Sequence, residues 1–576
     1  MKDRLKRLCF ILITLLLILG ARLIQLQIIQ GKRYARLSDR NRIRKIVLPA
    51  PRGRIFDRNG ILLADTRPTW TVAIIPTETN DSALALLSIL LNRPQNELLR
   101  RLQPVSEVPA PIDILRNASF DVIAKIEENN FRLPGVLVRV DHIRNYPFRN
   151  LYSHVIGYVG EITEEELSRD SSYRLLDYIG KTGIEARYER FLRGRDGYKY
   201  VEVDARGREI GPLPEKRPEP YIPGKDIYLT IDHNLQQAAY DLISKYERAA
   251  VVAIAINTGE ILCLVSYPDF DPNIFLAPLN PSQWNTLISN KSKPFYNRAI
   301  SSAYPPGSTF KPLVALLALE KQLITPHAQL LPCNGTFQYG NRKFKCWSAH
   351  GRLNIIGAIE QSCNVFFYQL GTKIRVDTLA EFCHQFGLGK NTGIDIPGEN
   401  AGNIPDRDFL NRRYGKNQWT QGFMLNYCIG QGEVLVTALQ LTQLYSCFAN
   451  GGFYFRPYLV AKIESAGQII LINKPQRFEV KINQTNLDWI KNALTRVVEY
   501  GTGQAAQLQE ITIAGKTGTA QNPPNPDHAW FVGYAPADNP EIAIAVIIEN
   551  AGHGGTVAAP IVGELVRYYF TKRTLP

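Results

Sequence analysis

An uncharged apolar run near the amino terminus sets the strongest limit on how this chain can be arranged. Residues 8–21 contain no charged side chain, and four basic residues precede them. Fourteen helical residues span roughly 21 Å, which is short of the roughly 30 Å hydrocarbon core of a bilayer. Leucine and isoleucine continue to Ile29, however. We therefore expect one transmembrane helix over about residues 8–29.

The alternative for this segment is a signal peptide that is cleaved off. The length of the run fits the hydrophobic region of such a peptide, but no A-x-A-like cleavage site follows it. We therefore favour a retained anchor. Basic residues stand on both sides of the run, so the positive-inside rule leaves its orientation open, although long domains cross membranes largely regardless of charge.

The positive charge of the chain is concentrated beside this segment. The formal net charge is +14, and residues 1–60 hold 15 Lys and Arg against three acidic residues. The remainder is nearly neutral, which favours a membrane surface as the partner of the basic segment and argues against nucleic acid. Eight cysteines in 576 residues exclude a disulfide scaffold, and this length indicates several folded domains.

A proline-rich segment divides the chain. Residues 212–224 hold five prolines, and such a cluster indicates a domain boundary. We expect a cytoplasmic tip with the anchor over residues 1–30, an N-terminal module over 31–222 and a C-terminal domain over 223–576.

Local patterns predict mixed helices and strands in both parts. In the N-terminal module, Asn59-Gly60 predicts a hairpin turn, and residues 181–185 lead into a helix that ends near Gly194. In the C-terminal domain, we expect helices from about Ser308 and Pro560. We also expect strands over 227–231, 250–256, 261–266, 511–514, 529–534 and 541–549.

Ser308 and Lys311 form the first part of a candidate catalytic site. Pro305, Pro306 and Gly307 stop any preceding element, so Ser308 begins a helix, where backbone N–H groups stabilise negative charge. A lysine three residues later returns to the same face. A partly desolvated lysine with a lowered pKa can serve as the base that a nucleophilic serine needs. An ordinary capped helix with a surface lysine gives the same tetrapeptide.

Two further short motifs follow in the same domain. Ser362-Cys-Asn364 and Lys516-Thr-Gly-Thr519 come after the first motif in chain order. Alone, the first could be a helix cap and the second a turn. Gly518 leaves space above its strand for a peptide substrate. Together the three motifs form the S-x-x-K, S-x-N, K-T-G set of penicillin-recognising serine acyltransferases.

With these motifs the chain resembles the class B penicillin-binding proteins, most closely the elongation transpeptidases, over nearly its whole length. The resemblance implies an α+β multidomain fold: one transmembrane helix, an extended mixed α/β pedestal module of the dimerisation type, and a transpeptidase domain with an antiparallel sheet flanked by helices. It is carried by Arg52-Gly-Arg-Ile-Phe-Asp-Arg-Asn-Gly-Ile-Leu-Leu-Ala64, Gly180-Lys-Thr-Gly-Ile-Glu185, Pro305-Pro-Gly-Ser-Thr-Phe-Lys311, Gly430-Gln-Gly432, Lys516-Thr-Gly-Thr-Ala-Gln521, His528-Ala-Trp-Phe531 and Ile548-Glu-Asn-Ala-Gly552.

The resemblance also implies catalytic roles. Ser308 would attack the D-Ala-D-Ala carbonyl of a peptidoglycan stem peptide, and Lys311 would take its proton. Ser362 would relay a proton to the departing D-Ala, and Asn364 would hold the stem peptide. A side-chain amine of a neighbouring stem would then attack the acyl-enzyme; water in its place would give a D,D-carboxypeptidase side reaction. β-Lactams would trap the serine.

Substrate binding is implied for the Lys516 strand and the strand after it. Lys516, Thr517 and Thr519 would bind the terminal carboxylate, and backbone N–H groups of Ser308 and Thr519 would form the oxyanion hole. Gly518 belongs to the same substrate-binding set. His528 and Trp530 are expected to line the cleft as well, and their alternative is the core of the strand that carries them.

Three cysteines and a histidine fall close together around the second motif. Cys333, Cys346, His350 and Cys363 lie within about thirty residues, and they offer the ligands of a structural Cys₃His zinc site. Such an ion would brace the catalytic turn, although the chemistry needs no cofactor. Some elongation-type family members resemble this chain in carrying zinc here, and others have carboxylates. A Cys333–Cys346 disulfide or simply buried thiols are the alternatives.

Other functions remain open alternatives. A serine β-lactamase or β-lactam sensor shares the Ser-Thr-Phe-Lys segment, a division-type transpeptidase shares all three motifs, and a non-catalytic scaffold would use only the N-terminal module. By the resemblance, the anchor and pedestal would bind and activate a SEDS-family glycan polymerase. The chain would be a single-pass inner-membrane protein with its catalytic domain on the periplasmic side.

Overall fold

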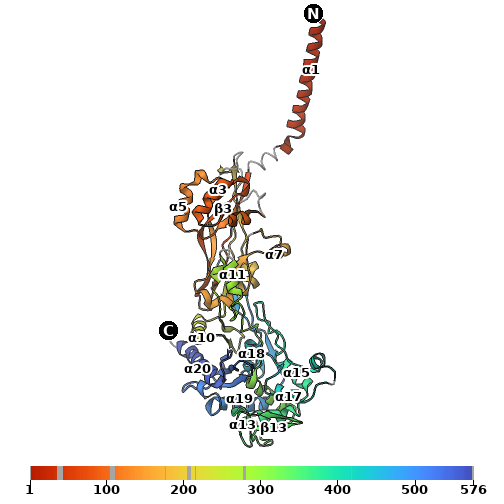
Figure 1. Cartoon of the computed structure of the whole chain (residues 1–576), viewed down its shortest axis with the longest axis vertical. Coiled ribbons are helices and arrows are strands. Elements are labelled where there is room, and N and C mark those ends of the chain that lie inside the picture. The colour runs from red at the N-terminus through yellow and green to blue at the C-terminus, as the bar shows by residue number, and fades with distance from the viewer. Residues whose placement is uncertain are drawn as a thin grey trace. The chain divides into compact units, whose positions relative to one another are not determined.

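The structure is a computed structural model of the chain, and it describes residues 2–34, 43–103, 111–175, 177–203, 209–213, 216–276, 281–416 and 418–573 (Figure 1). These residues form two compact units. Unit 1 comprises Met1–Arg52, Arg67–Ile143 and Arg193–Gly224, and unit 2 comprises Gly53–Thr66, Arg144–Leu192 and Lys225–Pro576. The domain boundaries drawn from the sequence stay a prediction, and Pro214 of the proline-rich segment lies outside the described residues.

The amino-terminal apolar segment is helical. The α-helix α1 (Lys2–Ile24) continues as a short π-helix, η1 (Gln25–Ile29). The two together have 28 residues, an 18-residue window within them has a mean hydropathy of 2.4, and that window is not buried in the protein. Within the described part of the chain, this is the one helix long and apolar enough to cross a membrane. It starts earlier than the predicted residue 8, because the basic residues before the apolar run continue the same helix.

Beyond α1, unit 1 combines short sheets with the helices α3 (Asp81–Leu91), α4 (Gln95–Leu102) and α5 (Phe120–Glu128). The strands β1 (Ile43–Leu48), β8 (Gly197–Val203) and β9 (Glu209–Pro212) pair antiparallel in the order β1-β8-β9. The end of β3 (Leu62–Ile74) pairs with β4 (Ile112–Leu115), and β5 (Val136–Asn145) pairs with β3. These helices bury their apolar sides.

One sheet of unit 2 begins with the predicted hairpin. The strand β2 (Ile55–Phe56) pairs with the start of β3 across the Asn59-Gly60 turn, where Gly60 has a φ of +85°. The sheet continues through β10 (Asp226–Leu229) and β16 (Val460–Ser465) to β17 (Gln468–Ile472). The helix predicted to end near Gly194 is two short helices, α8 (Gly183–Arg187) and α9 (Glu189–Leu192).

A five-stranded antiparallel sheet forms the centre of unit 2. Its order is β12-β11-β21-β20-β19, with β11 (Ala249–Ala255), β12 (Ile261–Tyr267), β19 (Ala514–Ala520), β20 (His528–Ala535) and β21 (Ile542–Ile548). All of β20 and β21 is buried. A sheet with near-continuous apolar strands must be covered on both faces.

Two helix layers cover this sheet. Alternate side chains of β11 point to opposite faces: Val251 packs in one cluster with α10 (His233–Ile243) and α20 (Gly554–Arg573), and Val252 packs in the other with α18 (Ala438–Ala449). The helix α12 (Lys311–Glu320) belongs to the second cluster and is buried at all but its last residue. Figure 1 shows the blue α20 and the blue-green α18 around this sheet.

Unit 2 has further α-helices and strands outside these sheets and helix layers. They are α6 (Ser153–Ile156), β6 (Val159–Glu161), α7 (Glu164–Arg169), β7 (Tyr178–Gly180), α11 (Pro281–Ile288), β13 (Thr336–Tyr339), β14 (Arg342–Lys345), α13 (Ile355–Glu360), α14 (Asn364–Gly371), α15 (Val376–Gln385), α16 (Arg407–Tyr414), α17 (Gly422–Tyr427), β15 (Phe453–Phe455), β18 (Arg477–Glu479) and α19 (Gln484–Glu499).

The predicted strands of the C-terminal domain are confirmed, with two differences at the edges of elements. Strand β19 begins at Ala514 and not at residue 511, because its ladder with β20 starts at the Ala514–Tyr534 pair and Pro536 beyond it cannot donate a backbone hydrogen bond. Helix α20 begins at Gly554, and Pro560 lies inside it rather than in its first turn.

Candidate active site

Ser308 lies in a tight turn that joins a buried helix. The turn is the 3₁₀-helix η7 (Gly307–Phe310), and α12 follows it directly. Gly307 has a φ of +56°, a conformation that favours glycine, and a Cβ there would stand 2.6 Å from the Thr519 carbonyl oxygen. Its own N–H donates to the Gly430 carbonyl at 2.8 Å. The turn is therefore held between β19 and the loop at Gly430.

Lys311 is fully buried one turn below the serine. Its Nζ donates to the Ser362 carbonyl oxygen at 2.7 Å, to Asn364 Oδ1 at 2.7 Å and to Ser362 Oγ at 3.3 Å. Burial lowers the pKa of Lys311 to about 8, against a smaller opposing effect of Cys346 and Cys363. A substantial fraction of this amine is therefore neutral near physiological pH, as a general base requires.

Ser362 occupies a strained position between two helices. It lies between α13 and α14, is buried, and has a φ of +53°. This region is uncommon for a residue with a side chain, and it persists where surrounding contacts hold it. Asn364 begins α14, and its backbone N–H donates to Cys346 Sγ at 3.2 Å. The second motif is thus fixed by Lys311 on one side and by a cysteine on the other.

The third motif runs along the edge strand β19 of the central sheet. Thr517 and Thr519 line the cavity beside Ser308. Lys516 is fully buried, and its Nζ lies 3.2 Å from Thr517 Oγ1 and 3.4 Å from Thr502 Oγ1. Burial, and then the nearby Lys311, hold the pKa of Lys516 well below its usual value. Two buried amines thus create a positive field beneath the threonines.

These three segments meet in one cavity of about 990 Å³. Side chains of the three motifs line it together: Ser308, Ser362, Asn364, Thr517 and Thr519. The tertiary structure therefore brings together the motifs that are far apart in the chain. A peptide end that enters this cavity meets the Ser308 hydroxyl and a row of polar side chains, and the buried amines of Lys311 and Lys516 contact several of those side chains.

Thr502 and Gln431 are among the polar residues of the cavity that were not singled out from the sequence. Thr502 Oγ1 lies 2.6 Å from Thr517 Oγ1, in the loop after α19. Gln431 donates to the Thr519 carbonyl at 3.0 Å and accepts from the Gln521 N–H at 3.3 Å. The only sequence signal for either was its glycine neighbours, as in Gly430-Gln-Gly432.

The reason for glycine at position 518 differs from the sequence-based expectation. A Cβ on Gly518 would meet Thr309 Cγ2 at 2.8 Å, Trp530 Cβ at 2.9 Å and the Pro306 carbonyl oxygen at 3.0 Å. Gly518 is not among the residues that line the cavity. The missing side chain therefore makes room for the Ser308 turn, and the role of Gly518 in substrate binding stays a prediction.

His528 and Trp530 lie behind the cavity wall. Trp530 is fully buried and donates from Nε1 to the Pro305 carbonyl at 3.2 Å. His528 accepts the Asn550 N–H at 3.1 Å, and burial lowers its pKa. Neither side chain lines the cavity. Their contact with substrate stays a prediction, and their described contacts are those of core residues that support the Ser308 turn.

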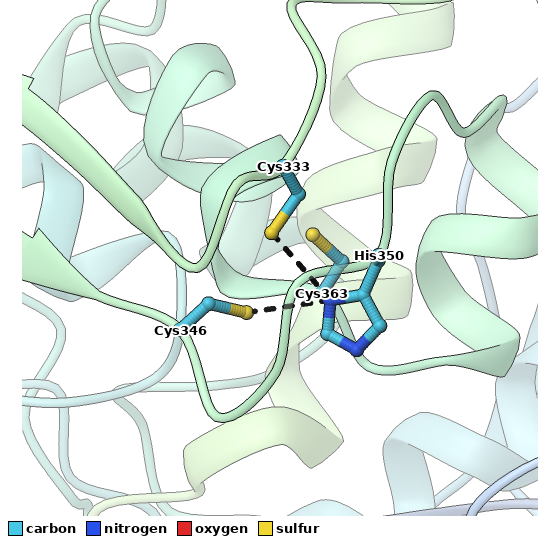
Figure 2. Close-up of side chains that lie close together, drawn as sticks. All are labelled: Cys333, Cys346, His350 and Cys363. Carbon is cyan, nitrogen blue, oxygen red and sulfur yellow. Dashed lines mark hydrogen bonds between the residues drawn. The ribbon is translucent and has the colours of Figure 1, made fainter.

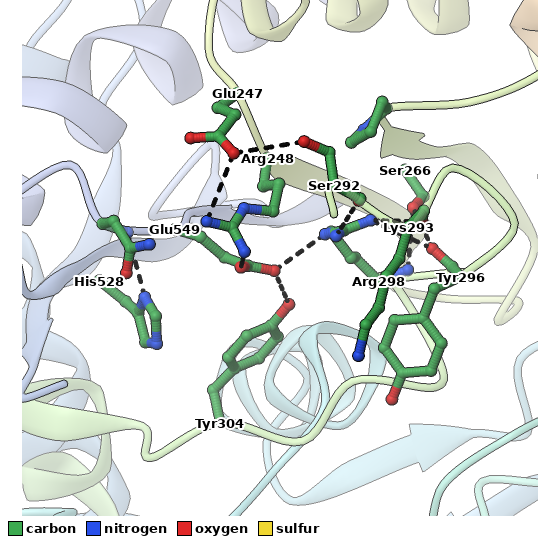
Figure 3. A network of polar contacts seen from close by, with 12 residues as sticks. Glu247, Arg248, Ser266, Ser292, Lys293, Tyr296, Arg298, Tyr304, His528 and Glu549 are labelled. Atoms are coloured by element: carbon green, nitrogen blue, oxygen red, sulfur yellow. Dashed lines mark hydrogen bonds and ion pairs between the residues drawn. The ribbon is translucent and has the colours of Figure 1, made fainter. Parts of the chain in front are cut away.

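A charged network lies next to these two residues (Figure 3). Glu549 accepts from Arg298 Nε at 2.8 Å and from the Tyr304 hydroxyl at 2.7 Å, and Arg248 stands 3.5 Å away. The ring of Tyr304 packs edge-on against His528. Because Tyr304 precedes the Ser308 turn by four residues, this network fixes the chain just before the serine.

The four predicted metal ligands converge (Figure 2). One ligand atom from each of Cys333, Cys346, His350 and Cys363 lies within 4.8 Å of the others. His350 Nδ1 is 3.6 Å from the sulfur of both Cys333 and Cys346. All eight cysteines are free, so this structure has no Cys333–Cys346 disulfide. Three thiols and an imidazole around one point match the donor set of structural zinc.

Comparison with known proteins agrees with this site. Residues 249–567 match the penicillin binding protein transpeptidase domain, and residues 47–229 match the penicillin-binding protein dimerisation domain. Among curated proteins, the chain is 37% identical over 576 residues to the peptidoglycan D,D-transpeptidase MrdA of Acinetobacter baumannii, covering 95% of this chain and 84% of that protein.

Solved structures extend the likeness to the fold. Penicillin-binding protein 2 of Helicobacter pylori, solved as a complex with MreC, is 27% identical with a TM-score of 0.82, covering 92% of this chain and 100% of that chain. A chain from a structure titled as a peptidoglycan synthase complex that coordinates polymerization and crosslinking is 29% identical with a TM-score of 0.73, covering 99% of this chain and 98% of that chain. The chain therefore belongs to the penicillin-binding protein 2 family of peptidoglycan D,D-transpeptidases.

Proposed function

We propose that this protein cross-links peptidoglycan stem peptides during cell-wall elongation, through an acyl-enzyme on Ser308. The Ser308 oxygen attacks the carbonyl carbon of the penultimate D-alanine, and the terminal D-alanine leaves. The amine of a neighbouring stem peptide then attacks the ester, releases Ser308 and forms the cross-link. The observation that carries this proposal is that Ser308, Ser362, Asn364 and the β19 threonines line one cavity, while the buried amine of Lys311 contacts Ser362 and Asn364.

Lys311 and Ser362 transfer the protons in this scheme. The buried amine is neutral often enough near neutral pH to accept the Ser308 proton. Ser362 Oγ lies 3.3 Å from that amine, so a proton can pass from Lys311 through the hydroxyl to the leaving amine. Asn364 holds the Lys311 ammonium from the other side and offers its amide to the stem peptide.

The strand β19 orients the substrate in this scheme. Thr517 and Thr519 line the cavity, and the Thr517 hydroxyl lies 3.2 Å from the buried Lys516 amine; together these groups suit the terminal carboxylate of the stem peptide. The close approach of Gly307 to Thr519 supports an oxyanion hole formed by the backbone N–H groups of Ser308 and Thr519. Such donors typically contribute about 3 kcal/mol of transition-state stabilisation.

Labelling with a penicillin tests the reaction class and the nucleophile together. The purified full-length protein in detergent is incubated with benzylpenicillin, and the digest is analysed by mass spectrometry. We expect one stable adduct on Ser308, and none in Ser308→Ala. Fast release of hydrolysed penicillin would indicate a β-lactamase instead, and a Ser308→Ala variant that still supports cell-wall synthesis would indicate a scaffold.

We also propose a structural zinc ion at Cys333, Cys346, His350 and Cys363. The convergence of their ligand atoms supports it. The ion would tie β14 and the loop after it to the turn that carries Ser362, because Cys363 is the next residue along the chain. It would supply rigidity and take no part in the reaction.

The membrane anchor and the partner complete the proposal. The long apolar helix α1 suits a single-pass anchor with the catalytic unit on the periplasmic side, where stem peptides are cross-linked. A relative comes from a peptidoglycan synthase complex, which supports a SEDS-family glycan polymerase as the partner of anchor and pedestal. Replacing residues 2–29 with an unrelated transmembrane helix should abolish co-purification of that polymerase and leave penicillin labelling intact.

A further inference from the structure

Strand β17 is an exposed apolar edge of the sheet that also contains β16 and β10. It stands at the end of the strand order β17-β16-β10-β2, and all five of its residues are exposed. The exposed fractions are 51% for Ile469, 44% for Ile470, 37% for Leu471 and 59% for Ile472. Within the described parts of the chain, no strand pairs with its outer edge.

Proteins usually protect such an edge. Natural sheets place charges, prolines or bulges on edge strands, because a free row of backbone N–H and C=O groups invites another strand. Residues Gln468–Ile472 contain neither a charge nor a proline. A two-residue turn, in which Ala466 and Gly467 both have positive φ, joins β16 to β17, and the pairing of the two strands has a bulge that leaves Ile470 without a partner in β16. The edge is thus preformed.

A cationic cavity adjoins this strand. It has a volume of about 580 Å³, and Leu471 and Lys474 line it together with Arg187, Arg190 and Arg456. None of these four cations forms an ion pair with a carboxylate among the described residues. The cavity therefore carries an uncompensated positive field directly beside an apolar edge.

The single carboxylate of the cavity does not neutralise this field. Asp395 is buried and accepts the backbone N–H groups of Leu459 and Val460, at 2.7 and 2.9 Å, and the Tyr188 hydroxyl at 2.9 Å. Its hydrogen-bonding capacity is used within the protein. An anionic group of another molecule therefore fits beside the arginines of this cavity.

We propose that β17 and this cavity form a docking site for an extended acidic segment of a partner protein. The segment adds to the outer edge of β17 as a further strand, so that its backbone pairs with the free N–H and C=O groups and its apolar side chains cover the exposed isoleucines. Its carboxylates enter the cavity and pair with the arginines and Lys474. A second copy of this chain fits less well, because its own β17 brings no carboxylate.

Peptide binding tests the charge preference. The probes are two fluorescein-labelled decapeptides, one alternating valine with aspartate and one alternating valine with lysine, titrated with the full-length protein in detergent micelles. We expect the aspartate peptide to bind at least tenfold more tightly by fluorescence anisotropy. The double change Arg187→Gln and Arg190→Gln should remove that preference, and Arg412→Gln, at an exposed arginine on α16, should keep it. Equal binding of the two peptides to the unaltered protein would overturn the proposal.

A second measurement tests strand addition itself. Saturating aspartate peptide should slow amide hydrogen exchange in residues 468–472 by tenfold or more. The double change Ile470→Ser and Ile472→Ser should weaken binding tenfold. The matched change Ile288→Ser, at a residue 54% exposed on α11, should leave binding unchanged. Unaltered penicillin labelling of each variant checks that it is folded.

Three results would contradict the proposal, and two of them would favour another occupant. Absence of protection in 468–472 would exclude strand addition. Inorganic pyrophosphate that binds the cavity while the peptide does not would indicate a small-anion site. If the protein forms a concentration-dependent dimer and the double change Ile470→Ser and Ile472→Ser prevents dimerisation, the occupant is a second copy of the chain.

Discussion

The Nζ atom of Lys311 donates a hydrogen bond of 2.7 Å to Oδ1 of Asn364, which lies 53 residues further along the chain. This contact joins the first catalytic motif to the second. It also explains how a fully buried amine is tolerated, because two strong acceptors compensate part of the lost hydration. Burial still disfavours the charged form and lowers the pKa of Lys311, so the amine can act as a base.

The rate of acylation should therefore depend on the charge of Lys311. Burial lowers the pKa of this amine to about 8, and only the neutral form accepts a proton. Below pH 8 the neutral fraction rises about tenfold per pH unit, and above pH 8 it levels off. We expect the second-order rate constant for a fluorescent penicillin to follow this curve between pH 5.5 and 9.5.

Two variants sharpen this test. Lys311→Arg keeps a permanent charge and should lose at least about 10³-fold in acylation rate. Lys321→Met, at an exposed residue just after α12, should keep the profile of the unaltered protein. A rate that is flat from pH 6 to 8, or that has its midpoint near 10.5, would show that Lys311 is not the base.

Gly518→Ala should slow acylation although it adds only one methyl group. The new carbon would stand 2.8 Å from Thr309 Cγ2 and 2.9 Å from Trp530 Cβ, so the Ser308 turn must move away from β19. We expect a loss of about 1–3 kcal/mol in the free energy of unfolding and about 10² in acylation rate.

The matched control is Gly211→Ala, where nothing lies within 4 Å of the added carbon. Thermal unfolding and penicillin labelling of both variants measure the two effects. If Gly518→Ala were acylated at the normal rate, the turn would not depend on contact with β19.

His350→Ala should remove the proposed zinc ion. The protein purified without chelator should contain about one zinc per chain, and the variant should contain less than half of that. Because the proposed ion would brace the turn at Ser362, the variant should unfold about 5 °C lower or more and acylate more slowly. His327→Ala, at an exposed histidine, should retain the metal. An unaltered protein without zinc, whose thiols titrate freely, would contradict the site.

Glu549→Gln should destabilise the protein strongly. Arg298 is 3% exposed and depends on Glu549 for its charge partner, and leaving a buried charge unpaired costs about 3–5 kcal/mol. Since Tyr304 also bonds Glu549 just before the Ser308 turn, acylation should slow as well. Urea denaturation gives the first quantity and penicillin labelling the second.

Glu564→Gln provides the comparison for this change. Glu564 is 48% exposed and pairs with Arg567 on the surface of α20, where such pairs contribute little. We expect a change within about 0.5 kcal/mol. Equal effects of the two substitutions would mean that the network behind the active site is not needed for folding.

The sequence by itself determined the reaction class, the anchor and most strands. Apolar runs bounded by turn residues located β11, β12, β20 and β21, because a strand that is buried on both faces is a short continuous apolar run in the sequence. The motifs at Ser308, Ser362 and Lys516 could be assigned because each depends on short spacing along the chain. The cysteines could be assigned as a cluster for the same reason.

Only the tertiary structure decided which groups share the cavity and which lie behind it. Thr502 and Gln431 reach the site from loops without a pattern of their own. The expectations for Gly518 and His528 depended on which face of a strand meets the cavity, and that is set by packing against the Ser308 turn. Burial, which lowers the pKa of Lys311, arises from residues distant in the chain, so no local pattern could supply it.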